Sequence, residues 1–228
     1  MCKYSLLSLV DFFGEISSRH IRHLQMMTHR AWWQIRNMGH APEKIHLMAG
    51  SLDEWIAAGG ATEEGPTKAL DCNDLDLSKP ASYLATDPQN IVDMQGMLKI
   101  IEEGDRSDSI IIDARAKERF LGLVEEPRPG MRLGHMPRAK NIPFMSLIDP
   151  DNVLQFKPKE EIAAIIREAG VDVDSPKNIV VSCGSGATAC AVVAALEVLG
   201  RSPLQNYVYD GSWAEWGAEA QTPIVKND

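Results

Sequence analysis

The residues with the clearest chemical potential surround Cys183, in the segment VVSCGSGATACAVVAAL. The apolar run NIVVSC predicts a buried strand that ends at this cysteine, and ligands bind at the carboxyl ends of strands in open α/β sheets. Residues 184–186 (Gly-Ser-Gly) then predict a tight loop, and a helix is expected to start near Thr188. Loop N–H groups and the positive end of a helix favour a thiolate, so Cys183 is predicted to be a nucleophile.

The other cysteines give no such signal. A buried, inert thiol is the alternative interpretation for any single cysteine, and we keep it for Cys190, which lies in the predicted helix among alanines and valines. The four cysteines form no CxxC pair and show no zinc-ligand spacing, and the histidines near the N-terminus are too loosely spaced to indicate a metal site (Cys2, Cys72, Cys183 and Cys190; His20, His23 and His29). We therefore expect no bound metal and a reducing compartment.

Two arginines near the expected strand ends could bind an anionic ligand. Arg119 lies in KERF and Arg128 in EEPRPG, and a guanidinium can bind a planar carboxylate with two hydrogen bonds. Solvated surface charge is the alternative for each. Arg115 follows the strand residue Asp113 and could form a structural ion pair with it. His135, between Gly and Pro residues, is interpreted as stabilising a turn rather than as a general base.

The elements that must position these residues alternate between strands and helices. Apolar runs between turn signals predict buried parallel strands at residues 109–115, 178–183 and 206–211. Helical patterns cover residues 90–104, 159–169, 188–200 and 212–217, and residues 122–140 predict a long loop. This alternation predicts an α/β domain with a mostly parallel sheet flanked by helices. Nearer the N-terminus we expect a helix at residues 30–38, a strand at residues 44–49 and a helix closed by Gly59 and Gly60.

The overall composition is that of an ordinary globular protein. Of the 228 residues 44% are hydrophobic and 24% charged, and the net charge is -9. The acidic balance argues against nucleic acid as the main partner. No apolar run reaches the length of a membrane span, and the N-terminus is a poor secretory signal. We expect no membrane association and a cytoplasmic location, with the mitochondrion as the alternative.

Several motifs in one order resemble a known family. CGSGATAC, DARAKERFLG, EEPRPGMRLGHMPRAKNIPF and YDGSWAEWG are similar to motifs of the 3-mercaptopyruvate sulfurtransferases, in the two-domain rhodanese (thiosulfate sulfurtransferase) family. The segment from THRAWWQIRNMGH to AAGGATEEG resembles the closing part of that family's first domain. The expected division is an unassigned segment (1–27), a partial N-terminal rhodanese-like domain (28–65), a linker (66–84) and a C-terminal catalytic rhodanese domain (85–223).

The resemblance implies roles for individual residues. Cys183 corresponds to the sulfur-carrying cysteine, and Ser185 to a loop serine that assists proton movement. Arg119 and Arg128 correspond to the arginines that hold the substrate's carboxylate and carbonyl groups. The remaining loop residues are expected to contribute to substrate binding: Gly184, Gly186, Ala187 and Thr188. The family usually has Val at the position of Ala187. No cofactor is implied.

The implied reaction moves sulfur from 3-mercaptopyruvate through a Cys183 persulfide to a thiol acceptor, such as thioredoxin or glutathione, or to cyanide, and releases pyruvate. In the thiosulfate-preferring branch basic residues follow the cysteine, whereas this chain has Gly184 and Ser185, which favours 3-mercaptopyruvate as the donor. Thiosulfate is the alternative donor. A degenerate, non-catalytic binding module is a second alternative. A cysteine phosphatase is disfavoured, because its phosphate-binding arginine is replaced by Ala189.

The first domain is expected to be incomplete. An acidic residue that the family supplies from that region has no identified counterpart, so we expect weaker turnover than in full-length relatives. We also expect the apolar side chains of residues 28–65 to bury against the second domain or another chain, among them Trp32, Trp33 and Trp55.

Overall fold

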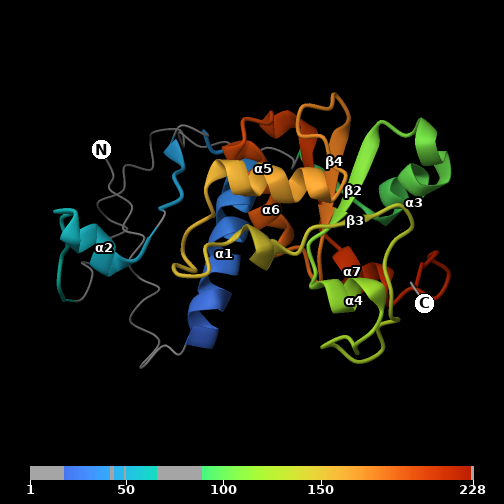
Figure 1. Cartoon of the computed structure of the whole chain (residues 1–228), viewed down its shortest axis with the longest axis horizontal. Helices are drawn as coiled ribbons and strands as arrows, with labels where there is room; N and C mark the ends of the chain where they lie inside the picture. Colours follow the sequence, from blue (N-terminus) through green and yellow to red (C-terminus); the bar gives the residue numbers. More distant parts are fainter. Residues whose placement is uncertain (1–17, 42–43, 49, 66–88, 227–228) are drawn as a thin grey trace, which may run out of the picture.

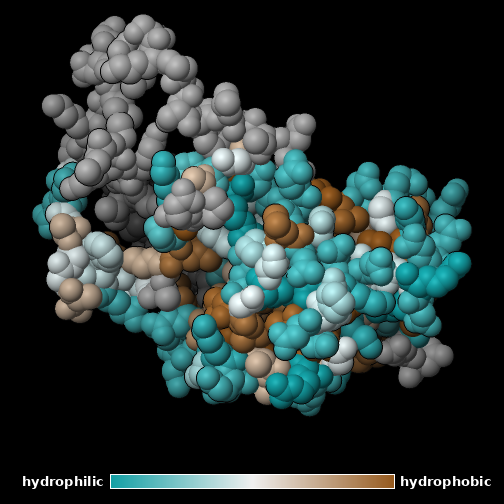
Figure 2. Space-filling model, turned by 90° about the horizontal axis from the view of Figure 1, so that it is seen from above, coloured by the Kyte–Doolittle hydropathy of each residue, from teal (hydrophilic) through white to brown (hydrophobic). Residues whose placement is uncertain are grey.

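The computed structural model describes residues 18–41, 44–48, 50–65 and 89–226 (Figure 1). The expected linker at residues 66–84 and the first 17 residues lie outside this described part. Within it, no helix is long and apolar enough to cross a membrane. The face seen in Figure 2 is largely hydrophilic, with hydrophobic residues gathered in a few separate groups.

Five parallel strands form one sheet in the order β1-β5-β4-β2-β3. The strands are β1 (Ile91–Val92), β2 (Ser109–Asp113), β3 (Lys140–Asn141), β4 (Asn178–Ser182) and β5 (Asn206–Tyr209). The central strands β2 and β4 pair over their whole length, with Ile112 opposite Val181. This arrangement confirms the predicted α/β class with a parallel sheet, because parallel strands need crossovers and helices to cover both faces.

Two helical layers cover the sheet (Figure 1). One face, which carries Ile112 and Val181, packs against α1 (Ser18–Asn37), α5 (Lys159–Glu168) and α6 (Ala189–Val198). The other face, which carries Ile111 and Val180, packs against α3 (Met94–Glu103) and α7 (Ser212–Trp216). The remaining helices are α2 (Leu52–Ala57), α4 (Lys117–Leu121) and the 3-10 turns η4 (Gly104–Arg106), η5 (Phe144–Leu147) and η6 (Pro203–Gln205).

The N-terminal helix α1 packs against α6 of the sheet domain. Trp33 of α1 is 1% exposed and belongs to the same core cluster as the sheet, because the alanine-rich surface of α6 lets the helix approach closely. Arg36 donates two hydrogen bonds of 2.5 and 2.7 Å to the Glu197 carboxylate on α6. Part of the N-terminal segment is therefore an integral part of the domain's core.

Other expectations for the N-terminal segment are wrong. Residues 44–48 form no strand, because no described strand lies beside them to accept their backbone hydrogen bonds. Trp55 on α2 is 46% exposed rather than buried. The helix expected from residue 90 begins at Met94, since residues 91–92 pair with β5 and the Asp93 side chain caps the helix by accepting a hydrogen bond from the Gly96 N–H.

Candidate active site

Cys183 directly follows β4, at the carboxyl end of a central strand. The Ser185 N–H points at its Sγ over 3.4 Å, and the Cys183 N–H donates to the Ser212 Oγ at 3.1 Å. Cys183 is only 1% exposed. A backbone N–H directed at sulfur stabilises negative charge there, which is what both a thiolate and a persulfide anion require.

The turn between β5 and α7 holds the cysteine loop from a second side. Ser212 adopts a positive φ of 52°, which lets its hydroxyl donate to the Tyr209 carbonyl at 2.8 Å while it accepts from Cys183. The following N–H groups donate to the loop's carbonyls, Trp213 to Cys183 at 2.9 Å and Ala214 to Gly184 at 3.0 Å. A non-glycine residue with positive φ costs about 1–2 kcal/mol, so this turn is held in place by these contacts.

The far side of the loop is anchored on α6. Gly186 has a φ of 77°, and its carbonyl accepts a hydrogen bond from the Cys190 thiol at 3.3 Å. Burial raises the pKa of Cys190 to about 12. Cys190 is therefore a neutral donor near pH 7, in keeping with the structural role predicted for it.

A pocket of about 180 Å³ opens beside the loop. Its walls combine cationic, anionic and apolar side chains with loop backbone: Arg119, Glu126, Pro127, Arg128, Met131, Gly184, Ser185, Trp213 and Ala214. Cys183 is not among the residues that line the pocket, whereas the next two residues, Gly184 and Ser185, are. Access to the sulfur from the pocket is therefore controlled by the position of the loop residues Gly184 and Ser185.

A chain of alternating charges orients Arg119 in this pocket. Arg115, whose side chain is fully buried, bonds both Asp113 oxygens, the Gly134 carbonyl and Glu126 Oε1 at 2.9 Å. Its guanidinium stacks over Trp213 at 4.0 Å. Glu126, 4% exposed, also accepts from Arg119 at 2.5 and 3.2 Å. Arg115 thus forms the structural ion pair expected for it. Because Glu126 is fixed by Arg115, it also orients Arg119 through their shared hydrogen bonds.

Arg128 reaches the pocket from the exposed side of its loop. Its guanidinium donates to the Gly184 carbonyl at 3.2 Å. A Cβ at Gly184 would lie 3.1 Å from the Arg119 guanidinium, so the missing side chain leaves room for that arginine. Both arginines and the cysteine loop therefore meet at one place, which suits a small anion with its reactive end towards the loop.

The described domain matches a family model over more than half of the chain. Residues 94–219 match the rhodanese-like domain. The chain belongs to the rhodanese family. This finding confirms the resemblance identified in the sequence motifs.

Similar proteins extend the match beyond that rhodanese domain. The 3-mercaptopyruvate sulfurtransferase of Escherichia coli is 37% identical over 195 residues, which cover 86% of this chain and 62% of that relative. The enzyme of the same name from Mus musculus is 35% identical over 193 residues, covering 84% of this chain and 58% of the relative. This rhodanese chain thus spans about three-fifths of the length of the curated relatives it matches.

Solved structures agree with this assignment. The structure of SseA, a 3-mercaptopyruvate sulfotransferase from Escherichia coli, aligns with a TM-score of 0.61 at 31% identity, over 83% of this chain and 63% of SseA. Tum1 from Saccharomyces cerevisiae aligns with a TM-score of 0.67 at 26% identity, over 89% of this chain and 66% of Tum1. EanB in complex with ergothioneine, at 18% identity and a TM-score of 0.69, shares the fold alone.

The rhodanese site brings together only some of the residues expected from the sequence. Arg119, Arg128, Gly184 and Ser185 line the pocket, and Cys183 lies behind them. The other predicted binding residues do not line it: Gly186, Ala187 and Thr188. Gly186 instead forms part of the loop's anchor on α6.

Three contributors to the site were not predicted from the sequence: Glu126, Ser212, and an ion pair between Arg30 of α1 and Asp210 of the turn between β5 and α7. The Gly-Ser after β5 and the acidic residues of EEPRPG were visible signals for two of them. His135 is buried, stacks on Phe120 at 3.7 Å and places Nδ1 2.8 Å from that residue's carbonyl oxygen, as expected of a residue that stabilises a turn.

Proposed function

We propose that this chain is a sulfurtransferase that takes sulfur from 3-mercaptopyruvate, carries it as a persulfide on Cys183 and passes it to a thiol or cyanide. The observation that supports this most directly is the Ser185 N–H aimed at the Cys183 sulfur, beside a pocket that holds Arg119 and Arg128. The names of the relatives at 35–37% identity point to the same donor.

In the first step the Cys183 thiolate attacks the substrate's sulfur. The new S–S bond forms as the S–C bond breaks, and the electron pair of that bond goes to the departing pyruvate enolate, which takes up a proton to give pyruvate. Arg119 and Arg128 bind the carboxylate and carbonyl oxygens, so they also stabilise the charge that develops on the enolate. Ser185 lies on the pocket wall, where its hydroxyl can assist the proton movement.

In the second step an acceptor thiolate or cyanide attacks the outer sulfur. The S–S bond breaks, its electron pair returns to Cys183, and the acceptor leaves as a persulfide or as thiocyanate. Thioredoxin and glutathione both offer a suitable thiol. The Ser185 N–H can stabilise the Cys183 thiolate, both before it attacks the donor and when the S–S bond breaks and the electron pair returns to Sγ.

The charges around the pocket favour a monoanion. Arg115 and Arg119 are offset by Asp113 and Glu126, whereas Arg128 forms no ion pair with a described residue and lines the pocket as a cation. 3-Mercaptopyruvate presents one carboxylate, whereas thiosulfate is a dianion. With no further cation at Gly184 or Ser185, we expect 3-mercaptopyruvate to have the higher kcat/KM.

The test is turnover with cyanide as acceptor, following pyruvate and thiocyanate together. We expect equal amounts of both products and no turnover in Cys183→Ser, whose hydroxyl does not ionise near neutral pH. Cys190→Ser is the matched control and should stay active. Appreciable turnover in Cys183→Ser, with its circular dichroism spectrum unchanged, would remove Cys183 from the mechanism. A higher kcat/KM with thiosulfate would overturn the substrate assignment.

A further inference from the structure

Arg30 of α1 reaches across to the cysteine loop. Its guanidinium contacts the Asp210 carboxylate, on the turn between β5 and α7. The Arg30 side chain is 16% exposed and that of Asp210 is 43% exposed. The guanidinium also lies over the Trp33 ring, 5.1 Å from its centroid, so Arg30 is fixed on the core side as well.

The pair lies against the most constrained point of the loop. A Cβ at Gly186 would come within 2.9 Å of the Arg30 guanidinium and of the Asp210 carbonyl oxygen, and 2.8 Å from an Asp210 carboxylate oxygen. Gly186 with its positive φ is therefore packed directly on the ion pair. Asp210 is two residues from Ser212, whose hydroxyl accepts the Cys183 N–H.

We propose that Arg30 is a positioning residue for the Cys183 loop, acting through Asp210 and Gly186. Helix α1 precedes the residues that match the rhodanese-like domain, so the N-terminal segment supplies part of the active site's framework. Arg30 holds the β5–α7 turn and the loop in one register. The Ser185 N–H then stays aimed at Sγ. The sulfur-loading part of this inference rests on the proposed function, whereas the loop-ordering part does not.

The same helix offers a matched control. Arg36 also bridges α1 to the sheet domain, through Glu197, with side chains 12% and 15% exposed. It also lies over a tryptophan, Trp32, at 4.2 Å. Arg36 and Arg30 are therefore similarly buried, and each pairs with a carboxylate and lies over a tryptophan ring, but Glu197 lies near the end of α6 away from the loop. Loss of Arg36 should weaken the attachment of α1 without changing the loop.

The experiment compares the full chain with Arg30→Met, Arg30→Lys and Arg36→Met by hydrogen exchange of the 183–189 segment and by the single-turnover rate of sulfur loading from 3-mercaptopyruvate. For Arg30→Met we expect about tenfold faster exchange and about tenfold slower loading, the scale of one charge-assisted hydrogen bond. Arg30→Lys should recover most of both. Arg36→Met should lower the melting temperature without changing the hydrogen exchange of the loop or the rate of sulfur loading.

Unchanged loop exchange in Arg30→Met overturns the proposal, and so does an equal effect of Arg36→Met, which would indicate general packing of α1. If Arg30→Met fails to fold, Asp210→Asn replaces it. That variant keeps the helix intact and should speed loop exchange in the same direction, and unchanged exchange there also overturns the proposal. If the unsubstituted chain takes up no sulfur, the proposed function fails. The hydrogen exchange of residues 183–189 still tests whether Arg30 orders the loop.

Discussion

Replacing Glu126 with Gln tests how the pocket orients Arg119. The carboxylate accepts three guanidinium hydrogen bonds, one from Arg115 at 2.9 Å and two from Arg119 at 2.5 and 3.2 Å. Gln keeps the shape but turns one acceptor oxygen into a donor that faces a cation. Arg115 keeps its hydrogen bonds to Asp113 and the Gly134 carbonyl, whereas Glu126 is the side-chain acceptor of Arg119 in the described part of the chain, and the Arg119 side chain is 25% exposed.

The magnitude follows from these contacts. Hydrogen bonds to charged groups contribute about 1.5–3 kcal/mol, and a partly exposed Arg119 regains some of that from water, so we expect a loss of about 2 kcal/mol in unfolding free energy. For a chain of this size that lowers the Tm by about 4–8 °C. With Arg119 less well oriented, kcat/KM for 3-mercaptopyruvate should fall about tenfold. The extra positive charge should at the same time favour thiosulfate, so the thiosulfate to 3-mercaptopyruvate ratio of kcat/KM should rise.

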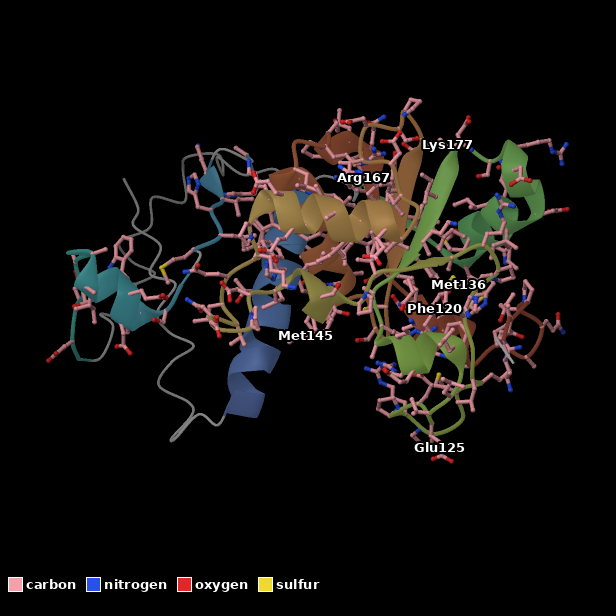
Figure 3. The ribbon with its side chains drawn as sticks, in the orientation of Figure 1. Phe120, Glu125, Met136, Met145, Arg167 and Lys177 are labelled. Atoms are coloured by element: carbon pink, nitrogen blue, oxygen red, sulfur yellow. The ribbon has the colours of Figure 1, made fainter. Side chains whose placement is uncertain are left out.

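Glu125→Gln is the matched control. This neighbouring residue is exposed and points away from the body of the protein (Figure 3), so the same change of charge leaves the ion-pair chain intact. Thermal unfolding and steady-state kinetics on both variants distinguish the effect of a less well oriented Arg119 from the effect of the changed net charge. If the Glu126 and Glu125 variants have the same Tm and the same thiosulfate to 3-mercaptopyruvate ratio of kcat/KM, Glu126 does not orient Arg119 and the prediction is refuted.

Three further outcomes can be checked. Gly186→Ala should lower the unfolding free energy by about 2–4 kcal/mol and slow turnover strongly, because Gly186 has a positive φ and its Cβ would lie 2.8–2.9 Å from Asp210 and Arg30. Gly184→Ala should destabilise less, because its Cβ would meet only the end of the Arg119 side chain, at 3.1 Å. Urea titrations and kinetics on the two variants would show the difference. Burial lowers the pKa of His135, so below an unfolded pKa of 6.5 protonation favours the unfolded state. The unfolding free energy should therefore fall from pH 7.5 to pH 5.5, and less steeply in His135→Gln. Iodoacetamide at pH 8 should leave Cys190 unlabelled in the folded protein, because its thiol is buried and has a pKa of about 12, and labelling as fast as in urea would contradict that burial.

The central strands of the fold were predictable from local sequence. β2, β4 and β5 are mostly apolar segments between turn residues. Such segments are typical of strands that are buried on both faces of a parallel sheet. β1 and β3 have two residues each, so their pairing is decided by the strands beside them. The strand expected at residues 44–49 fails for the same reason, since β-propensity alone does not supply a partner strand.

The candidate site divides in a similar way. Cys183 and its loop could be predicted because strand, glycines and helix are consecutive in the sequence. Arg119 and Arg128 were assigned mainly through the family resemblance, since surface charge was the alternative for each, and both line the pocket. The groups that fix this site come from distant positions: Arg30 is 180 residues from Asp210, and Ser212 is 29 residues from Cys183. Such contacts depend on how α1 and the β5–α7 turn pack, which no local pattern encodes.

The most direct test of the account is the position of the transferred sulfur. The full chain is mixed with 3-mercaptopyruvate without an acceptor, trapped by alkylation and mapped by peptide mass spectrometry. We predict one added sulfur on Cys183, none on Cys190, and complete removal after cyanide is added. Sulfur on Cys190, or pyruvate release with no sulfur on Cys183, would contradict the assignment of Cys183 as the sulfur carrier.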